Sequence, residues 1–234
     1  MKDNIDNKKN ICNRKVIIEL RYEAIASMID KKGTIVEAIE KANVFSMAQW
    51  EIGNEIVIRD NEEKEEATNI VFVSFNRLSF TSFNIDSVDS YYEKFKKIYE
   101  TVFSVLGSPN IRRIGCRIIG TYKTNSNDFS DILSNMKKQF PSAFLLDQYP
   151  VKDLLFHLVY SSGMYKIGPL NTDDLFYERE FKSSKTIKHV GVAIDTDNYL
   201  TNETKSINDK HLIRDIYMLS LSVEKDLYTN LTNL

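Results

Sequence analysis

The sequence predicts an α+β protein with a duplicated order of elements: strand, helix, four strands, long helix. Two observations predict this class. Short stretches rich in β-branched and aromatic residues alternate with a period of two, and two long segments repeat apolar residues with helical spacing. A third observation, that the order starts again near residue 110, predicts one compact unit of two halves, residues 15–109 and 110–234, behind a disordered leader at residues 1–14.

Composition narrows the functional classes. The chain has 234 residues, 42% of them hydrophobic, and a formal charge of −2 from 31 basic and 33 acidic side chains. This balance gives no overall electrostatic drive toward nucleic acid or an anionic membrane. Two cysteines, Cys12 and Cys116, are too few for a disulfide framework and favour a reducing compartment. Because no apolar run reaches the roughly 20 residues of a membrane helix, we expect a cytoplasmic protein.

The first half opens with a strand at Val16–Ala24, whose even-numbered residues are apolar up to Tyr22. Thr34 can cap a short helix that ends near Asn43. The acidic run Asn61–Ala67 is expected to form an exposed hairpin loop. Four strands should follow the short helix: Val44–Trp50, Glu55–Arg59, Asn69–Phe75 and Arg77–Phe83.

A long helix closes this half. Asp86 or Ser87 can cap it, and the segment Val88–Leu106 carries a broad apolar stripe that begins at Val88 and reaches Phe103. Gly107, Ser108 and Pro109 then stop it.

The second half repeats this order. Ile111–Lys123 reads as a long strand, and Asn127 or Asp128 can cap a helix that runs to Phe140. Ser206 or Asn208 can cap a terminal helix. Further strands are expected at Phe144–Tyr149, Lys152–Ser161, Leu175–Lys182 and Thr186–Asp195. The terminal helix is expected to bury Leu212, Ile216, Leu219, Val223, Leu227 and Leu231.

This duplicated order resembles the TATA-binding-protein-like folds. That resemblance implies one curved antiparallel sheet, backed on its convex side by two long helices, with the first strands of the halves at its centre. Two ferredoxin-like domains, or a single sheet gripping one long helix, remain alternative arrangements of the same class.

The chain also resembles a sporadically distributed family of uncharacterised bacterial proteins. Members often carry a segment close to R-I-G-L-R-Y-I-N-R-I and a late D-I-D segment. The corresponding segments here are Arg113–Gly120, which keeps both arginines and the glycine, and Ala193–Asp197. The resemblance implies no known activity. It implies a patchy distribution, typical of mobile or phage-defence gene clusters.

Charged residues on the two central strands are the first candidate site. Arg113 and Arg117 share one face of their strand, and Cys116 lies on the other, which favours a core role for the thiol. If the first strands are neighbours, Glu19 and Arg21 lie on the arginine side. Cross-strand ion pairs of about 0.2–1 kcal/mol each could fix the register. Alternatively, the guanidinium groups bind an anionic ligand or a partner's acidic segment.

A metal site is the competing hypothesis. Two imidazoles and a carboxylate can bind zinc or iron, so His157, His189 and Asp195 form the alternative set for a metal-dependent hydrolase or nuclease. The Asp195-Thr196-Asp197 segment is also ordinary turn chemistry. Because no nucleophile elbow or phosphate-binding glycine loop is present, we expect no cofactor.

Nucleic-acid binding is the remaining class. Phe75, Phe80 and Phe83 could act as wedges in a minor groove. The acidic loop and the mixed charges of the long helices argue against duplex binding. The sequence therefore favours a non-catalytic interaction module that recognises a protein partner or a small anionic ligand on the concave sheet face. A homodimer remains open, because either long helix could pair between subunits.

Overall fold

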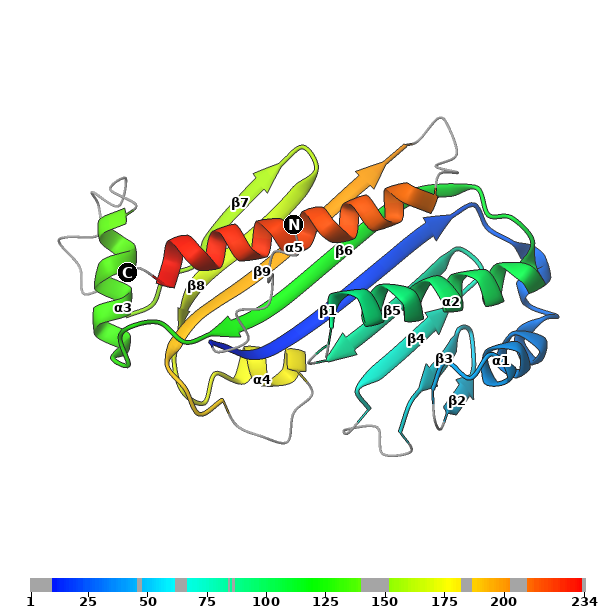
Figure 1. Ribbon diagram of the computed structural model, residues 1–234, viewed down its shortest axis with the longest axis horizontal. Helices are drawn as coiled ribbons and strands as arrows, with labels where there is room; N and C mark the ends of the chain where they lie inside the picture. The colour runs from blue at the N-terminus through cyan, green and yellow to red at the C-terminus, as the bar shows by residue number, and fades with distance from the viewer. Residues whose placement is uncertain are drawn as a thin grey trace. The chain divides into compact units, whose positions relative to one another are not determined.

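A computed structural model describes residues 10–45, 48–61, 67–83, 85, 87–139, 152–181, 187–202 and 210–232. Its described strands form one antiparallel sheet of nine strands in the order β2-β3-β4-β5-β1-β6-β9-β8-β7 (Figure 1). The α+β class with an antiparallel sheet is therefore confirmed. The strands are β1 (Ile11–Tyr22), β2 (Gln49–Ile52), β3 (Ile56–Arg59), β4 (Asn69–Val73), β5 (Arg77–Phe83), β6 (Ile111–Tyr122), β7 (Phe156–Tyr160), β8 (Gly163–Leu170) and β9 (Gly191–Thr201).

Five α-helices and one short 3-10 helix complete the described chain. They are η1 (Ala26–Met28), α1 (Lys32–Lys41), α2 (Val88–Leu106), α3 (Phe129–Gln139), α4 (Leu175–Phe181) and α5 (Lys210–Thr232). None of the described helices is long and apolar enough to span a membrane.

The chain divides into two compact units. Unit 1 comprises Met1–Arg14, Ile118–Asp197 and Ser220–Leu234, and unit 2 comprises Lys15–Arg117 and Asn198–Leu219. Strand β6, helix α5 and strands β1 and β9 each contribute residues to both units. These units are not the sequence halves 15–109 and 110–234, which remain a prediction about the repeat.

The two first strands, β1 and β6, are neighbours at the middle of the sheet order, as the sequence predicts. In unit 2, Glu23 N donates to Asn110 O at 3.0 Å, and in unit 1, Lys123 N donates to Asn10 O at 2.9 Å. Because one residue number rises as the other falls, the pair is antiparallel. Every apolar even-numbered residue from Val16 to Tyr22 is buried, which the alternation predicts.

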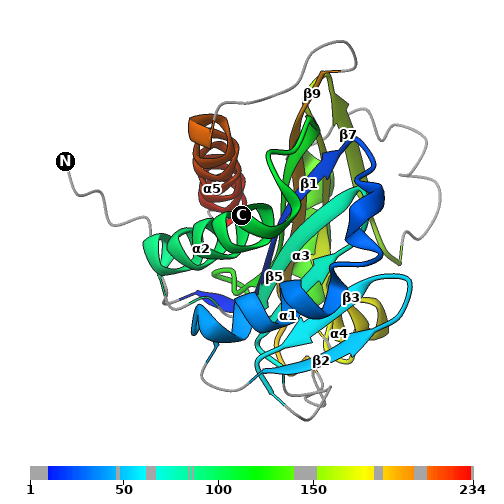
Figure 2. The ribbon, with the colours of Figure 1, turned by 90° about the vertical axis from the view of Figure 1, so that its right-hand side faces the viewer.

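Helices α1 and α2 lie on one face of the strands of unit 2 (Figure 2). The bounds of α2 match the sequence prediction, and Ser87 Oγ accepts a hydrogen bond from Ser90 N at 3.0 Å as its cap. Tyr91 fixes this helix to the sheet: its hydroxyl donates to Phe80 O at 2.8 Å, and its ring stacks on Phe80. Burial raises the pKa of Tyr91 well above its ordinary value.

In unit 1, a buried ion pair connects α5 to the sheet. Arg14 of β1 donates to Glu224 of α5, and the hydroxyl of Tyr122 on β6 donates to the same carboxylate. The side chains of Arg14 and Glu224 are only 7% and 5% exposed. An apolar cluster that includes Tyr122, Val192, Ile194, Tyr228 and Leu231 surrounds this contact.

The structure corrects the sequence prediction for Leu175–Lys182. This segment was expected to be a strand, but α4 occupies Leu175–Phe181. Asp174 Oδ1 accepts hydrogen bonds from Phe176 N and Tyr177 N, which is helix capping, and Tyr177 and Phe181 have the spacing of one helix face.

Helix α4 also corrects the expectation that helices back only one side of the sheet. In unit 1, Tyr177 and Phe181 of α4 pack on Ile119 and Ala193. The cluster of Tyr122 and Val192 lies on the alternate residues of β6 and β9, hence on the other face. Both faces of the unit 1 sheet are therefore covered by apolar side chains.

Strand β8 was not predicted, because two glycines and a proline lower its strand propensity. Gly168 is required there: a Cβ atom would lie 2.7 Å from Leu154 O. The predicted buried stripe of α5 is confirmed only in part. Leu231 is buried as expected, and Leu212, Ile216, Val223 and Leu227 are partly buried. Leu219 is 45% exposed, whereas Ile213, Tyr217, Leu221 and Tyr228, which the prediction omitted, are buried.

The predicted leader at residues 1–14 is corrected at its end. Ile11–Arg14 belong to β1, because Ile11 packs on the Tyr122 cluster and Arg14 pairs with Glu224. Several predictions lie outside the described residues: the leader at residues 1–9, Asp86, most of the acidic loop, the strand Phe144–Tyr149, and the caps Ser206 and Asn208.

We predict that Glu224→Ala lowers the free energy of unfolding by about 3–5 kcal/mol, because it removes a carboxylate from a buried charge pair. Glu224→Gln should lower the free energy of unfolding by a smaller amount, because the amide oxygen still accepts a hydrogen bond from Tyr122. Denaturant unfolding measures both. Glu93→Ala is the control: Glu93 pairs with Lys96 on exposed helix surface, and its loss should cost at most about 1 kcal/mol. Equal losses for Glu224→Ala and the control would contradict the structural role of Glu224.

Candidate anion-binding face

The face of unit 2 opposite α1 and α2, called the open face below, carries a charged cluster centred on Glu19. Arg21 Nε donates to Glu19 Oε1 at 2.8 Å, and Arg113 Nη1 donates to the same oxygen at 3.2 Å. Arg77 Nη1 lies 3.9 Å from Glu19 Oε2. Three guanidinium groups therefore share one carboxylate. We call Glu19, Arg21, Arg77 and Arg113 the open-face cluster.

Gly115 makes room for Arg113 in this cluster. A Cβ atom at residue 115 would lie 2.8 Å from Arg113 Nη1, so the guanidinium group lies directly over the glycine. The same group lies 5.0 Å from the centre of the Tyr199 ring on β9. This cation–π contact and the missing side chain at Gly115 hold Arg113 close to Glu19. The glycine of the Arg-Ile-Gly segment of β6 is therefore explained by the space that the guanidinium group of Arg113 needs.

Arg77 extends the cluster toward β3. Its Nη2 donates to Glu55 Oε2 at 2.7 Å, and its guanidinium carbon lies 5.9 Å from the centre of the Phe72 ring. Arg77 is the direct cross-strand partner of Arg21. Like charges in that position repel, and the carboxylates of Glu19 and Glu55 offset this repulsion.

The sequence predicted only some of the residues that come together on this face. Glu19, Arg21 and Arg113 come together as the alternation of β1 and β6 suggests. Arg117 lies two residues after Gly115 on the same side of β6 and is partly buried. Arg77, Glu55 and Tyr199 were missed. Arg77 is the first residue of β5 and faces Arg21 only through the long-range pairing of β1 with β5, which the sequence pattern does not give.

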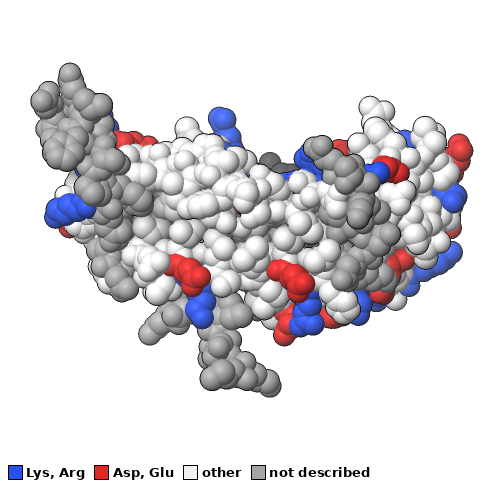
Figure 3. All heavy atoms as spheres, turned by 90° about the horizontal axis from the view of Figure 1, so that it is seen from above, with Lys and Arg blue, Asp and Glu red and all other residues white. Residues whose placement is uncertain are grey.

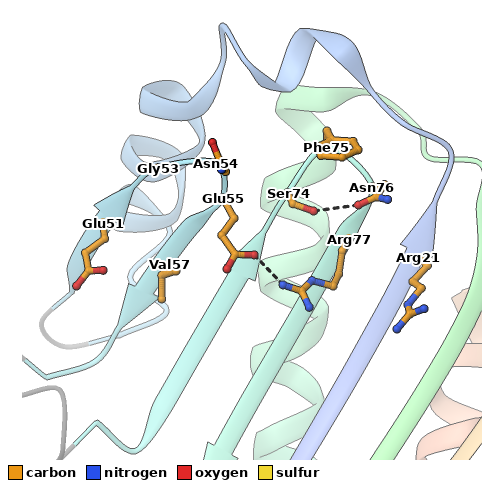
Figure 4. A pocket seen from close by; sticks show the side chains of 10 residues that line it. All are labelled: Arg21, Glu51, Gly53, Asn54, Glu55, Val57, Ser74, Phe75, Asn76 and Arg77. Atoms are coloured by element: carbon orange, nitrogen blue, oxygen red, sulfur yellow. Dashed lines mark hydrogen bonds and ion pairs between the residues drawn. The ribbon is translucent and has the colours of Figure 1, made fainter.

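An open-sided hollow of about 650 Å³ lies beside the cluster (Figure 4). Arg21 and Arg77 line it on one side, and Glu51 and Glu55, from the β2–β3 hairpin, line it on the other. Phe75, in the turn between β4 and β5, forms part of the wall. This volume is within the range of about 300–1,000 Å³ that is usual for small-molecule sites.

The three phenylalanines considered as wedges have different environments. Phe80 is fully buried in the core, and Phe83 is partly buried beneath Lys15, whose Nζ lies 5.6 Å from the ring centre. Phe75 is 48% exposed. They therefore form no common row of exposed rings.

The alternative metal set is not assembled. His157 is exposed on β7 with Lys166 as its cross-strand partner. His189 is half-buried near Lys123, and Asp195 is buried. Burial, and then the charge of Asp195, raise the pKa of Tyr177. Within the described ranges, no group of three His, Cys, Asp or Glu side chains could hold a metal ion. Cys12 and Cys116 form no disulfide, and Cys116 is buried as expected.

Charged side chains on the face shown in Figure 3 occur in small mixed groups. Acidic and basic atoms adjoin one another among the described residues that are visible there. This mixture agrees with the near-zero net charge of −2. The part of the described surface that is visible there therefore presents no broad patch of one sign.

Comparisons with known proteins do not identify the chain. No protein-family model and no curated protein matches it. Among solved structures, it is similar to an aspartate kinase from Clostridium acetobutylicum, described as an allosteric enzyme, with 9% sequence identity and a TM-score of 0.22. The match covers 89% of this chain and 33% of the kinase, so the chain spans about a third of that protein's length. A TM-score this low supports no conclusion about fold or activity.

We predict that His189 titrates below its ordinary pKa of 6.5, because burial, and then the charge of Lys123, disfavour its protonated form. The unfolded chain binds this proton more readily, so acidification through the ordinary pKa should destabilise the fold. When the pH is lowered from about 7 to about 5, the free energy of unfolding should therefore fall less for His189→Gln than for the native chain. Proton NMR titration of the imidazole checks the assignment, with exposed His157 as the internal reference. A pKa of 6.5 or above for His189 would contradict it.

Proposed function

We propose that the protein is a non-catalytic binding module whose open-face cluster recognises an anionic group on a protein partner or a small ligand. One observation carries this proposal: the carboxylate of Glu19 is within ion-pair distance of three guanidinium groups, those of Arg21, Arg77 and Arg113. Glu55 pairs with Arg77 as well. Because Arg21 is largely exposed, an incoming carboxylate or phosphate can approach its guanidinium group from solvent.

The arginines of the cluster differ in exposure, and so in how they could bind an anion. Arg21 is 61% exposed, so its fork can turn toward a ligand at little desolvation cost. Arg113 is 19% exposed and held between Tyr199 and Gly115, so it supplies a fixed positive charge. Arg117, on the same side of β6, adds a further cation by its place in the strand. Arginine binds planar anions in a bidentate manner, which favours carboxylates and phosphates over halides.

We further propose that the chain is a duplicated, TATA-binding-protein-like α+β fold. The order of the strands in the sheet supports this, although the second half has three strands after α3, with α4 between β8 and β9. In the first half, the sheet order β2-β3-β4-β5-β1 brings the last strand beside the first, and in the second half the order β7-β8-β9-β6 does the same. The family resemblance alone suggests a phage-defence or other mobile gene cluster. A cytoplasmic location is part of this proposal, and the lack of a disulfide between Cys12 and Cys116 supports it.

The test uses two anionic probes, inorganic phosphate and a hexaglutamate peptide, titrated by calorimetry at several salt concentrations. At least one should bind, with an affinity that falls as salt rises. Because a charge-assisted hydrogen bond contributes about 1.5–3 kcal/mol, Arg21→Ala should weaken binding about tenfold or more.

Arg179→Ala is the matched control, since it removes one positive charge from an exposed position on α4. It should leave the affinity unchanged. If neither probe binds, or if both variants behave alike, the open-face cluster is not an anion-binding site.

A further inference from the structure

The hollow beside the open-face cluster combines groups of different chemistry along its wall. Cationic side chains come from β1 and β5, an exposed aromatic ring comes from the β4–β5 turn, and amides come from two turns (Figure 4). Such convergence of a few polar groups beside an apolar surface is typical of a small-molecule site. The kinds of group present indicate which class of ligand fits.

The cationic side of the hollow suits a phosphate group. Arg21 and Arg77 both line it, and they are direct cross-strand partners, so their guanidinium groups can address one anion together. Arg77 is oriented by its hydrogen bond to Glu55 at 2.7 Å. Arginine forks match the geometry of phosphate oxygens.

The aromatic wall suits a planar ring. Phe75 is 48% exposed, so part of its ring is open to solvent at the wall of the hollow. Its backbone is fixed: Ile25 N donates to Phe75 O at 2.8 Å, and Ser74 N donates to Arg77 O at 2.8 Å across the turn. An aromatic ring on an anchored turn can serve as a stacking surface, and stacking accepts any nucleobase.

The remaining lining groups suit the base edge and the sugar. Asn54 and Asn76 are amides that can both donate and accept hydrogen bonds, as the polar edge of a base requires. The side chain of Asn76 is directed by Ser74, whose hydroxyl donates to its Oδ1 at 3.2 Å. Glu51 and Glu55 are acceptors, and carboxylates commonly bind ribose hydroxyl groups.

We infer that the hollow binds a nucleoside monophosphate, with the base stacked on Phe75 and the phosphate held by Arg21 and Arg77. This inference rests on the proposed anion-binding function and assigns it a ligand class. A bare anion would use only the arginines. A nucleoside monophosphate uses the aromatic ring, the amides and the carboxylates as well, so it accounts for all of these lining groups.

The experiment compares AMP, GMP, CMP and UMP with inorganic phosphate, adenosine and the hexaglutamate peptide, by calorimetry in one low-salt buffer. At least one nucleotide should bind about tenfold more tightly than phosphate, given the usual strength of base–aromatic stacking. Phe75→Ala should abolish that advantage and leave phosphate binding unchanged. Phe176→Ala, which removes another exposed ring that does not line the hollow, should have no effect.

The arginine variants separate this inference from the function on which it rests. Arg77→Gln and Arg21→Gln should weaken nucleotide and phosphate alike by about tenfold. If phosphate or the peptide binds through these arginines but no nucleotide binds more tightly than phosphate, the nucleotide inference fails and the anion-binding function stands. The nucleotide inference also fails if Phe75→Ala changes nothing, or if adenosine binds as well as AMP. If no probe binds, both fail.

Discussion

The sharing of one carboxylate, Glu19, among three arginines is the constraint around which the open face of unit 2 is arranged. Arg21 and Arg77 are direct cross-strand partners, a placement that repels unless an anion lies between their charged ends. Glu19 supplies that anion from β1, and Arg113 reaches it from β6 only because residue 115 has no side chain. The register of three strands and the glycine of the Arg-Ile-Gly segment are therefore linked through a single acceptor.

Unit 1 uses a charge pair in the opposite way. Arg14 and Glu224 are buried together, and Tyr122 donates to the same carboxylate. Burial makes such a pair costly to form and more costly to break, so it specifies how α5 lies on its part of the sheet. In the open-face cluster, Arg21 is largely exposed and Arg77 is partly exposed, so their ion pairs are more accessible to solvent than that of Arg14 and Glu224. That difference is why we assign a structural role to Glu224 and a binding role to the arginines around Glu19.

Local patterns predicted much of the fold. The alternation of apolar residues predicted which faces of β1 and β6 are buried. The cap residue Ser87 and the apolar stripe that follows it predicted helix α2. Where prediction failed, tertiary contacts overrode local preference. Glu224 is polar, yet it is buried because Arg14 and Tyr122 bind it, which moved the buried stripe of α5 away from Leu219. The glycines and the proline of β8 concealed a strand, since Gly168 is required by the close approach of Leu154 O.

The candidate site was predictable only as far as strand neighbours could be inferred. Glu19, Arg21 and Arg113 lie on the two central strands, whose pairing followed from the repeated order of elements. Arg77 and Tyr199 belong to β5 and β9, whose pairing depends on long-range register that periodicity does not contain. For the same reason, the sequence could not show that the neighbours of His157 and His189 include lysines, Lys166 and Lys123, rather than further metal ligands.

The most direct measurement of the central claim is the affinity of inorganic phosphate for the variant Glu19→Gln. If Glu19 occupies donors that a ligand needs, removing its charge from among the arginines should tighten binding about fivefold or more. The variant should still show a cooperative unfolding transition. Unchanged or weaker phosphate binding in a folded Glu19→Gln protein would contradict the account and show that the arginines serve only the register of the sheet.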